Sequence, residues 1–179
     1  MNAKQSTWND MIKPVVVLLI ICLVAGLALA VVNSVTAPII AEHTEAEKQA
    51  TYRALLPEAD SFTDLATTVD GVSAAMKANN GAGYIVAASA KGYKSSVTAT
   101  VAFDNDGNIL SLAMDASGET TGIGTRVAGG EFVDQFSGKA AEQFDISGVD
   151  TVTGATYSSR GAVNAINLAV QAYQEVRGN

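Results

Sequence analysis

The stretch Asp150–Arg160, DTVTGATYSSR, combines hydroxyl and backbone groups that could hold an anion. A helical pattern follows it, and the first turn of a helix leaves N–H groups unpaired and carries partial positive charge. Gly154 and Ala155 keep side-chain bulk away, while Thr153 and Thr156 flank them with hydroxyls. Such a place suits a phosphate group. The residues equally allow a plainer interpretation, in which a threonine or serine of the stretch only caps the helix.

Three runs of strand character precede this stretch, near residues 83–89, 95–103 and 108–115. Gly92 and Gly107 mark the turns between them. Apolar and small or polar side chains alternate along the middle run, as they do in a half-buried antiparallel strand. These runs predict an antiparallel sheet.

Helical patterns lie on both sides of the predicted sheet. Residues 42–59 read as a helix that Pro57 ends, residues 72–80 as a second, short helix, and the segment around Phe132 as a third. Apolar residues at i, i+3 and i+4 predict a final helix from about Ser158 to Val176. The fold class we expect is therefore α+β, an antiparallel sheet with flanking helices.

An uncharged stretch from Pro14 to Ile40 lies near the N-terminus, and its core, Val15–Val32, is apolar apart from Gly26. A helix of about 20 such residues spans a bilayer. We expect a transmembrane helix at residues 14–36, ended by the polar residues and the proline that follow Val32. The sequence Ala-Leu-Ala at residues 28–30 also allows a cleaved signal peptide.

Basic residues predict the orientation of this helix. Lys4 and Lys13 precede it, whereas the flank beyond it is acidic. The positive-inside rule then leaves residues 1–13 in the cytoplasm as a short tail and exports the rest. We expect a single-pass protein of the cell (inner) membrane, with a juxtamembrane helix and linker at residues 37–70 and an extracytoplasmic domain at residues 71–179.

Composition excludes several classes of function. The net charge is −7, no basic block is present, and nucleic-acid binding is not expected. One cysteine and one histidine cannot supply an iron–sulfur or zinc framework. Asp104–Asn108 looks like a calcium loop, but the twelfth position holds Asp115 where such a loop needs glutamate. Redox chemistry would therefore need an organic cofactor or a partner chain.

The heptapeptide Asp150–Thr156 resembles the Asp-x-x-Ser/Thr-Gly-Ala-Thr signature of flavinylated extracytoplasmic proteins. In that family FMN is joined through its phosphate to the hydroxyl of the final threonine, here Thr156. A dedicated flavin transferase makes the bond and uses FAD as donor. The resemblance thus implies a covalent FMN cofactor and a maturation partner.

A second stretch, Ser117–Gly124, is similar to the Glu-Thr-Pro-Gly-Leu-Gly loop that packs beside the flavin in the same family. Thr121 replaces the proline, which loosens the expected turn, and Ile123 replaces the leucine. No catalytic or metal-binding residue is implied. The two motifs together imply a cofactor-binding set of Glu119, Thr120, Thr121, Gly122, Gly124, Thr153, Gly154, Ala155 and Thr156.

The order of these features resembles the G subunits of Rnf complexes, the ion-translocating ferredoxin:NAD⁺ oxidoreductases, along nearly the whole chain. This implies an electron-carrying subunit that works among the other subunits, is not catalytic alone, and belongs to a complex that exports Na⁺ or H⁺. The C subunits of sodium-translocating NADH:quinone reductases share the domain but are typically longer.

Two further functions fit the residues. One is a non-redox, membrane-anchored extracytoplasmic binding module, in which TGAT only caps the helix. The other is a flavoenzyme that acts on a small exported substrate, which predicts turnover by the isolated domain.

Overall fold

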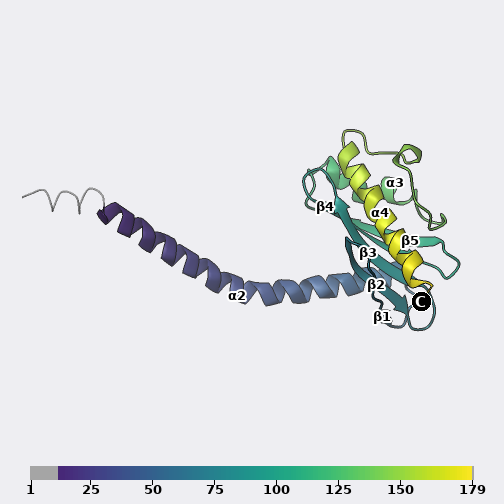
Figure 1. Ribbon diagram of the computed structural model, residues 1–179, viewed down its shortest axis with the longest axis horizontal. Coiled ribbons are helices and arrows are strands. Elements are labelled where there is room, and N and C mark those ends of the chain that lie inside the picture. Colours follow the sequence, from purple (N-terminus) through teal and green to yellow (C-terminus); the bar gives the residue numbers. More distant parts are fainter. Residues whose placement is uncertain (1–11, 179) are drawn as a thin grey trace, which may run out of the picture. The chain divides into compact units, whose positions relative to one another are not determined.

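The computed structural model describes residues 12–178. The chain divides into two compact units, one reaching to Lys48 and one starting at Gln49, and each is described by itself. Its α-helices and strands are labelled in Figure 1. In chain order they are α2 (Lys13–Leu55), β1 (Phe62–Asp64), β2 (Val72–Ala78), β3 (Tyr84–Lys91), β4 (Ser96–Phe103), β5 (Ile109–Asp115), the 3-10 helix η2 (Gly124–Ala128), α3 (Gly130–Val133), the 3-10 helix η3 (Ile146–Gly148) and α4 (Thr156–Val176).

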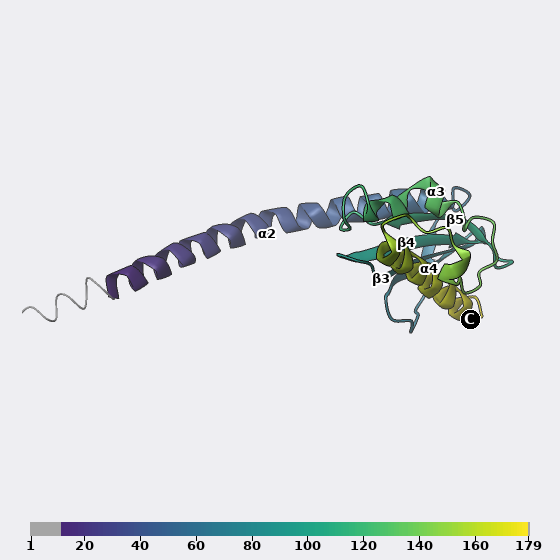
Figure 2. The ribbon, with the colours of Figure 1, turned by 90° about the horizontal axis from the view of Figure 1, so that it is seen from above.

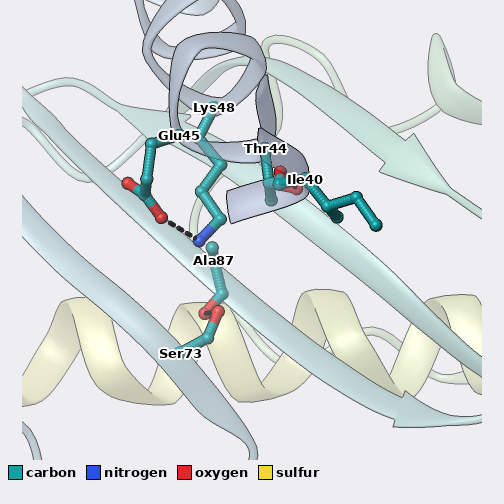
Figure 3. A network of polar contacts seen from close by, with 6 residues as sticks. All are labelled: Ile40, Thr44, Glu45, Lys48, Ser73 and Ala87. Carbon is teal, nitrogen blue, oxygen red and sulfur yellow. Dashed lines mark hydrogen bonds and ion pairs between the residues drawn. The ribbon is translucent and has the colours of Figure 1, made fainter. Parts of the chain in front are cut away.

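The first unit consists of the apolar part of α2. Lys13–Pro38 is long and apolar enough to cross a membrane. Its most apolar 18-residue window has a mean hydropathy of 3.4, and none of that window is buried within the protein. It is the one such helix among residues 12–178. Beyond Pro38 the helix surface becomes polar, and Lys48 pairs with Glu45 at 2.7 Å (Figure 3). The structure thus confirms an N-terminal helix suited to a bilayer.

The sequence predicted an end of this helix near Pro38, but α2 continues without a break to Leu55. A proline removes one N–H donor and restricts the preceding turn, but its own φ is helical, so the turns on either side can persist. The hydroxyl of Thr36 donates to the carbonyl of Val32 at 2.9 Å, and the hydroxyl of Thr44 donates to that of Ile40 at 2.8 Å (Figure 3). Polar side chains before and after the proline are therefore satisfied by the helix itself.

The second unit is built on a five-stranded antiparallel sheet in the order β1-β2-β3-β4-β5. Each strand pairs with its neighbour in sequence, so no connection within the sheet crosses over another strand. The strands β3, β4 and β5 are labelled in Figure 2. The three strands predicted near residues 83–115 are confirmed as β3, β4 and β5. With its flanking helices, the sheet confirms the α+β class.

The prediction of a short helix at residues 72–80 is wrong, because Val72–Ala78 forms strand β2 between β1 and β3. Its residues favour a helix locally, but Ala75 and Met76 are buried on opposite faces of the sheet. Burial on both faces outweighs the local preference. The hydroxyl of Ser73 also donates to the carbonyl of Ala87 on β3 at 3.2 Å (Figure 3).

Helix α4 packs along β3 and β4 and supplies the main core (Figures 1 and 2). Its predicted apolar stripe is confirmed, and Tyr173 is fully buried. The Tyr173 ring stacks on Phe103 with centroids 4.4 Å apart, and its hydroxyl donates to the Asp104 carbonyl at 2.9 Å. A smaller cluster around Tyr52, Ile85 and other residues covers the opposite face. The C-terminal part of α4 is thereby fixed against the end of β4.

Candidate flavin-attachment site

Thr156 is the first residue of α4, and its side chain is exposed. The N-cap position belongs to Ala155, and no side chain caps the helix. Within residues 12–178 the hydroxyl of Thr156 makes no hydrogen bond. The capping interpretation therefore does not apply to Thr156, whose hydroxyl faces solvent.

The first turn of α4 also leaves backbone donors open. The first hydrogen bond at this end runs from the Ser159 N–H to the Ala155 carbonyl at 2.9 Å. In the described part of the chain, no acceptor meets the N–H groups of Thr156, Tyr157 and Ser158. Gly154 precedes them with φ +81, and a Cβ placed on it would have open space around it. Unpaired donors beside a free hydroxyl fit a phosphate group.

Glu119 holds this turn in place, although its carboxylate is only 2% exposed. One oxygen accepts hydrogen bonds from the N–H groups of Lys94 (3.0 Å) and Ser95 (2.7 Å). The other accepts from the Tyr93 N–H (3.1 Å) and the Ser158 hydroxyl (2.5 Å). One buried carboxylate thus joins the β3–β4 turn, the loop after β5 and the start of α4.

The environment of Glu119 keeps it ionised. Burial acts to raise its pKa, but the hydrogen bonds from the Ser158 hydroxyl and from three backbone N–H groups lower it to about 2. Donors that bind the charged form outweigh the loss of water. Glu119 is therefore a charged, fully bonded anchor at neutral pH, and it has no free oxygen lone pair aimed at solvent.

Three glycines allow the segments to approach one another. A Cβ on Gly124 would lie 2.8 Å from the Ser158 hydroxyl, and one on Gly92 would lie 2.8 Å from a Glu119 oxygen. A Cβ on Gly161 would lie 2.7 Å from both the Gly92 Cα and the Lys91 carbonyl oxygen. The contact between α4 and the β3–β4 turn is therefore made by backbone on backbone.

A cleft of about 230 Å³ opens beside the attachment stretch. Arg126 and Glu131 form a loose ion pair at 3.9 Å on its wall, and both side chains are largely exposed. The Asp150 N–H and carbonyl are held by the Gln135 side chain at 2.8 and 3.1 Å. The residues that line the cleft are Arg126, Glu131, Phe132, Asp150, Thr151, Val152 and Thr153.

Two family models match the chain: the RnfG N-terminal region over residues 1–55 and the FMN-binding domain over residues 92–171. The first of these matches makes the chain similar to the G subunits of Rnf complexes. The FMN-binding match contains all three segments that Glu119 joins.

Two relatives are similar to the chain along nearly its whole length. The G subunit of the proton-translocating ferredoxin:NAD⁺ oxidoreductase complex of Clostridium ljungdahlii is 28% identical, with 94% of this chain and 95% of that protein covered. The G subunit of the Na⁺-translocating ferredoxin:NAD⁺ oxidoreductase complex of Acetobacterium woodii is 27% identical, with 96% of both chains covered.

The fold is similar to a solved structure, that of the C subunit of the Na⁺-translocating NADH-quinone reductase of Parabacteroides distasonis. That likeness has a TM-score of 0.50 and 19% identity, and it covers 60% of this chain and 62% of that one. This likeness supports the fold described above.

The structure brings together the two motifs found in the sequence. Thr153, Gly154 and Thr156 are exposed, and so are Thr121 and Gly122. Thr120 is half-buried, whereas Ala155, Glu119 and Gly124 are buried.

The loop closes without the proline of the family pattern. The Thr120 carbonyl accepts from the N–H groups of Ile123, Gly124 and Thr125 at 2.8 to 3.3 Å, and the Thr125 hydroxyl accepts from the Gly122 N–H at 2.9 Å. These bonds supply the closure that Thr121, in place of proline, was expected to weaken.

Several residues of the site carried no signal in the sequence. Lys94 and Ser95 contribute backbone N–H groups, which almost any residue could supply. The Ser158 hydroxyl donates to Glu119, whereas the sequence suggested only that a serine here could cap the helix. Gly92 was recognised as a turn but not as a contact of α4. Only the register of the sheet brings these groups beside Glu119.

Proposed function

We propose that this chain carries FMN as a phosphoester on Thr156 and acts as an electron-carrying subunit of an Rnf complex. The relatives named above are subunits of ferredoxin:NAD⁺ oxidoreductase complexes that move H⁺ or Na⁺. The observation that carries the proposal is the Thr156 hydroxyl, exposed and unbonded at the start of a helix whose first N–H groups lack acceptors in the described chain.

The residues fit the phosphate end of the cofactor. A phosphoester on the Thr156 oxygen would take the place that a capping side chain leaves empty, and the N–H groups of the first turn would face its charge. Flavin supplies electron transfer by its ring, and a link through phosphate leaves that ring unsubstituted. The chain needs no substrate pocket for this role, because its electrons pass between partner subunits.

Attachment requires a second protein. The Thr156 oxygen forms the new O–P bond, the P–O–P bond of FAD breaks, and AMP leaves with its phosphate. The hydroxyl proton must go to a base, and none is within hydrogen-bonding distance of Thr156 in the part of the chain described. A flavin transferase would therefore supply the base.

The membrane arrangement belongs to the same proposal. The apolar helix anchors the chain, with residues 1–13 in the cytoplasm and the FMN-binding domain on the other side. An exported protein is separated from the cytoplasmic FMN pool, and a covalent link prevents loss of the cofactor by dissociation. The ferredoxin-to-NAD⁺ reaction and the translocated ion, Na⁺ or H⁺, belong to the assembled complex.

The test is to express the full chain in membranes with an active flavin transferase and to compare Thr156→Ala with Thr151→Ala. Thr151 is exposed and precedes the TGAT sequence, so its variant is the matched control. We expect a fluorescent band on a denaturing gel for the wild type and for Thr151→Ala, and none for Thr156→Ala. The intact mass of the wild-type protein should include one attached FMN.

Other outcomes would contradict the proposal. A dark wild-type band in the presence of active transferase would favour a non-redox binding module. Turnover of a small substrate by the purified chain alone would favour a flavoenzyme. A fluorescent Thr156→Ala band would place the attachment elsewhere.

A further inference from the structure

Two exposed tyrosines lie beside Thr156. Tyr93, in the β3–β4 turn, is 68% exposed, and Tyr157, the second residue of α4, is 65% exposed. Their ring centroids are 6.3 Å apart with an angle of 40° between the planes. In the described part of the second unit, the other exposed large apolar side chains, Leu110 and Ile123, are less open, at 44% and 47%. An aromatic pair is thus open to solvent next to the acceptor hydroxyl.

The pair is rigidly supported although its rings are exposed. The Tyr93 N–H and the Ser158 hydroxyl bind the same oxygen of Glu119, at 3.1 and 2.5 Å. This shared oxygen fixes the backbone of Tyr93 beside the first turn of α4, and Tyr157 precedes Ser158 directly. The Arg160 guanidinium lies 6.0 Å from the Tyr157 ring centroid. Because the backbone is held, the two rings form a preorganised surface.

We propose that Tyr93 and Tyr157 form the surface on which the isoalloxazine ring of the FMN on Thr156 packs. This inference rests on the proposed function. Planar aromatic groups stack on one another at centroid distances of about 4.5–7 Å. A group tethered to the residue next to Tyr157 is present at high effective concentration, so even a modest contact keeps it docked. The nearby Arg160 adds positive charge suited to the phosphoester.

The test uses Tyr93 because this residue is distant from the attachment motif in sequence. Substitutions at Tyr93 therefore leave the motif intact, and the variants can still be loaded with FMN. Full-length Tyr93→Phe and Tyr93→Leu are compared with Leu110→Ala. Leu110 follows Ile109 on β5, and Ile109 pairs with Phe103 on β4. The Phe103 ring stacks on Tyr173 of α4. Since Tyr173 lies about 25 Å along α4 from Thr156, Leu110→Ala is a remote control at another exposed apolar residue. Each protein is loaded with FMN by the transferase and purified in detergent.

Fluorescence of the native proteins gives the readout. A phenol in contact with an excited flavin quenches the flavin fluorescence by donating an electron to the flavin. The electron then returns to the phenol, so there is no net reaction. We expect Tyr93→Phe to brighten the flavin while its anisotropy stays high, because phenylalanine still stacks. Tyr93→Leu should brighten it and lower the anisotropy, with a roughly two- to tenfold fall in the docked-to-free ratio from the loss of one aromatic contact. Leu110→Ala should change neither quantity.

The two proposals fail in different ways. A dark wild-type band on the denaturing gel would overturn the proposed function. A fluorescent band together with native fluorescence and anisotropy that are the same in wild type and both Tyr93 variants would overturn only the docking surface. A partner protein of the complex would then be the better candidate to cover the tyrosines.

Discussion

The carboxylate of Glu119 accepts a 2.5 Å hydrogen bond from the Ser158 hydroxyl, which is 39 residues further along the chain. Both residues are buried, with 2% of each exposed. This bond fixes the first turn of the last helix to the loop that follows the sheet. The geometry of the attachment site therefore depends on a charged group that does not itself face the site.

Glu119→Gln should destabilise the fold by about 2–4 kcal/mol, because an amide nitrogen would face backbone donors that now meet a carboxylate oxygen. Unfolding of the full chain in detergent, followed by circular dichroism against denaturant, measures this. Glu131→Gln is the matched control, since Glu131 is exposed and only loosely paired, and it should change stability by less than about 0.5 kcal/mol. Equal effects of the two changes would contradict the role of Glu119.

The same carboxylate predicts how stability depends on pH. The pKa of Glu119 is about 2 in the folded chain and 4.5 in its ordinary state. A lowered folded pKa contributes stability that is fully present above pH 4.5 and is lost as the pH falls toward 2. The contribution is about 3 kcal/mol. As the pH falls through this window, the free energy of unfolding should decrease more for the wild type than for Glu119→Gln. Parallel plots of this free energy against pH would contradict the prediction.

Gly161→Ala should weaken the contact between α4 and the β3–β4 turn. Alanine favours a helix by about 1 kcal/mol over glycine, but its Cβ would lie 2.7 Å from the Gly92 Cα and the Lys91 carbonyl oxygen. Overpacking against backbone costs about 1–3 kcal/mol, so the net change is destabilising. Gly148→Ala is the control, because nothing lies within 4 Å of its Cβ. Thermal unfolding should shift downward for Gly161→Ala alone.

The orientation can be tested by cysteine labelling, because Cys22 is the only cysteine of the chain. In a Cys22→Ala background, Ser137→Cys should react with a membrane-impermeant maleimide added outside the cytoplasmic membrane. Ser6→Cys should react only after permeabilisation, because the basic residues Lys4 and Lys13 keep that flank in the cytoplasm. The reverse labelling pattern would place the FMN-binding domain in the cytoplasm and contradict the proposed topology.

The parts of the fold that the sequence predicted are those with a clear period. Side chains alternate along most of β4, and α4 has an apolar stripe, so local pattern and tertiary packing agree there. The prediction for β2 was wrong because Ala75, Met76 and their neighbours favour a helix by local preference. They form a strand because β1 and β3 pair with them on either side. The continuation of α2 past Pro38 was missed because a proline reads as an end, whereas a long helix can include one.

The attachment stretch could be predicted in part. The resemblance pointed to Thr156, and the structure leaves its hydroxyl exposed at the start of α4. The partners of Glu119 could not be predicted, because three of them are backbone N–H groups 24 to 26 residues away. Their position depends on how β3, β4 and β5 align. Sequence patterns describe side chains along one element and do not describe such alignments.

The open position of the Thr156 hydroxyl on a finished domain has a consequence for biogenesis. Nothing needs to unfold for a modifying protein to reach this oxygen, and the surrounding turn already has its final shape. Chains can therefore be exported, folded and stored bare, then matured one at a time when flavin donor is available. Under flavin starvation, we expect cells to accumulate a stable, colourless pool of the chain that becomes competent without new synthesis.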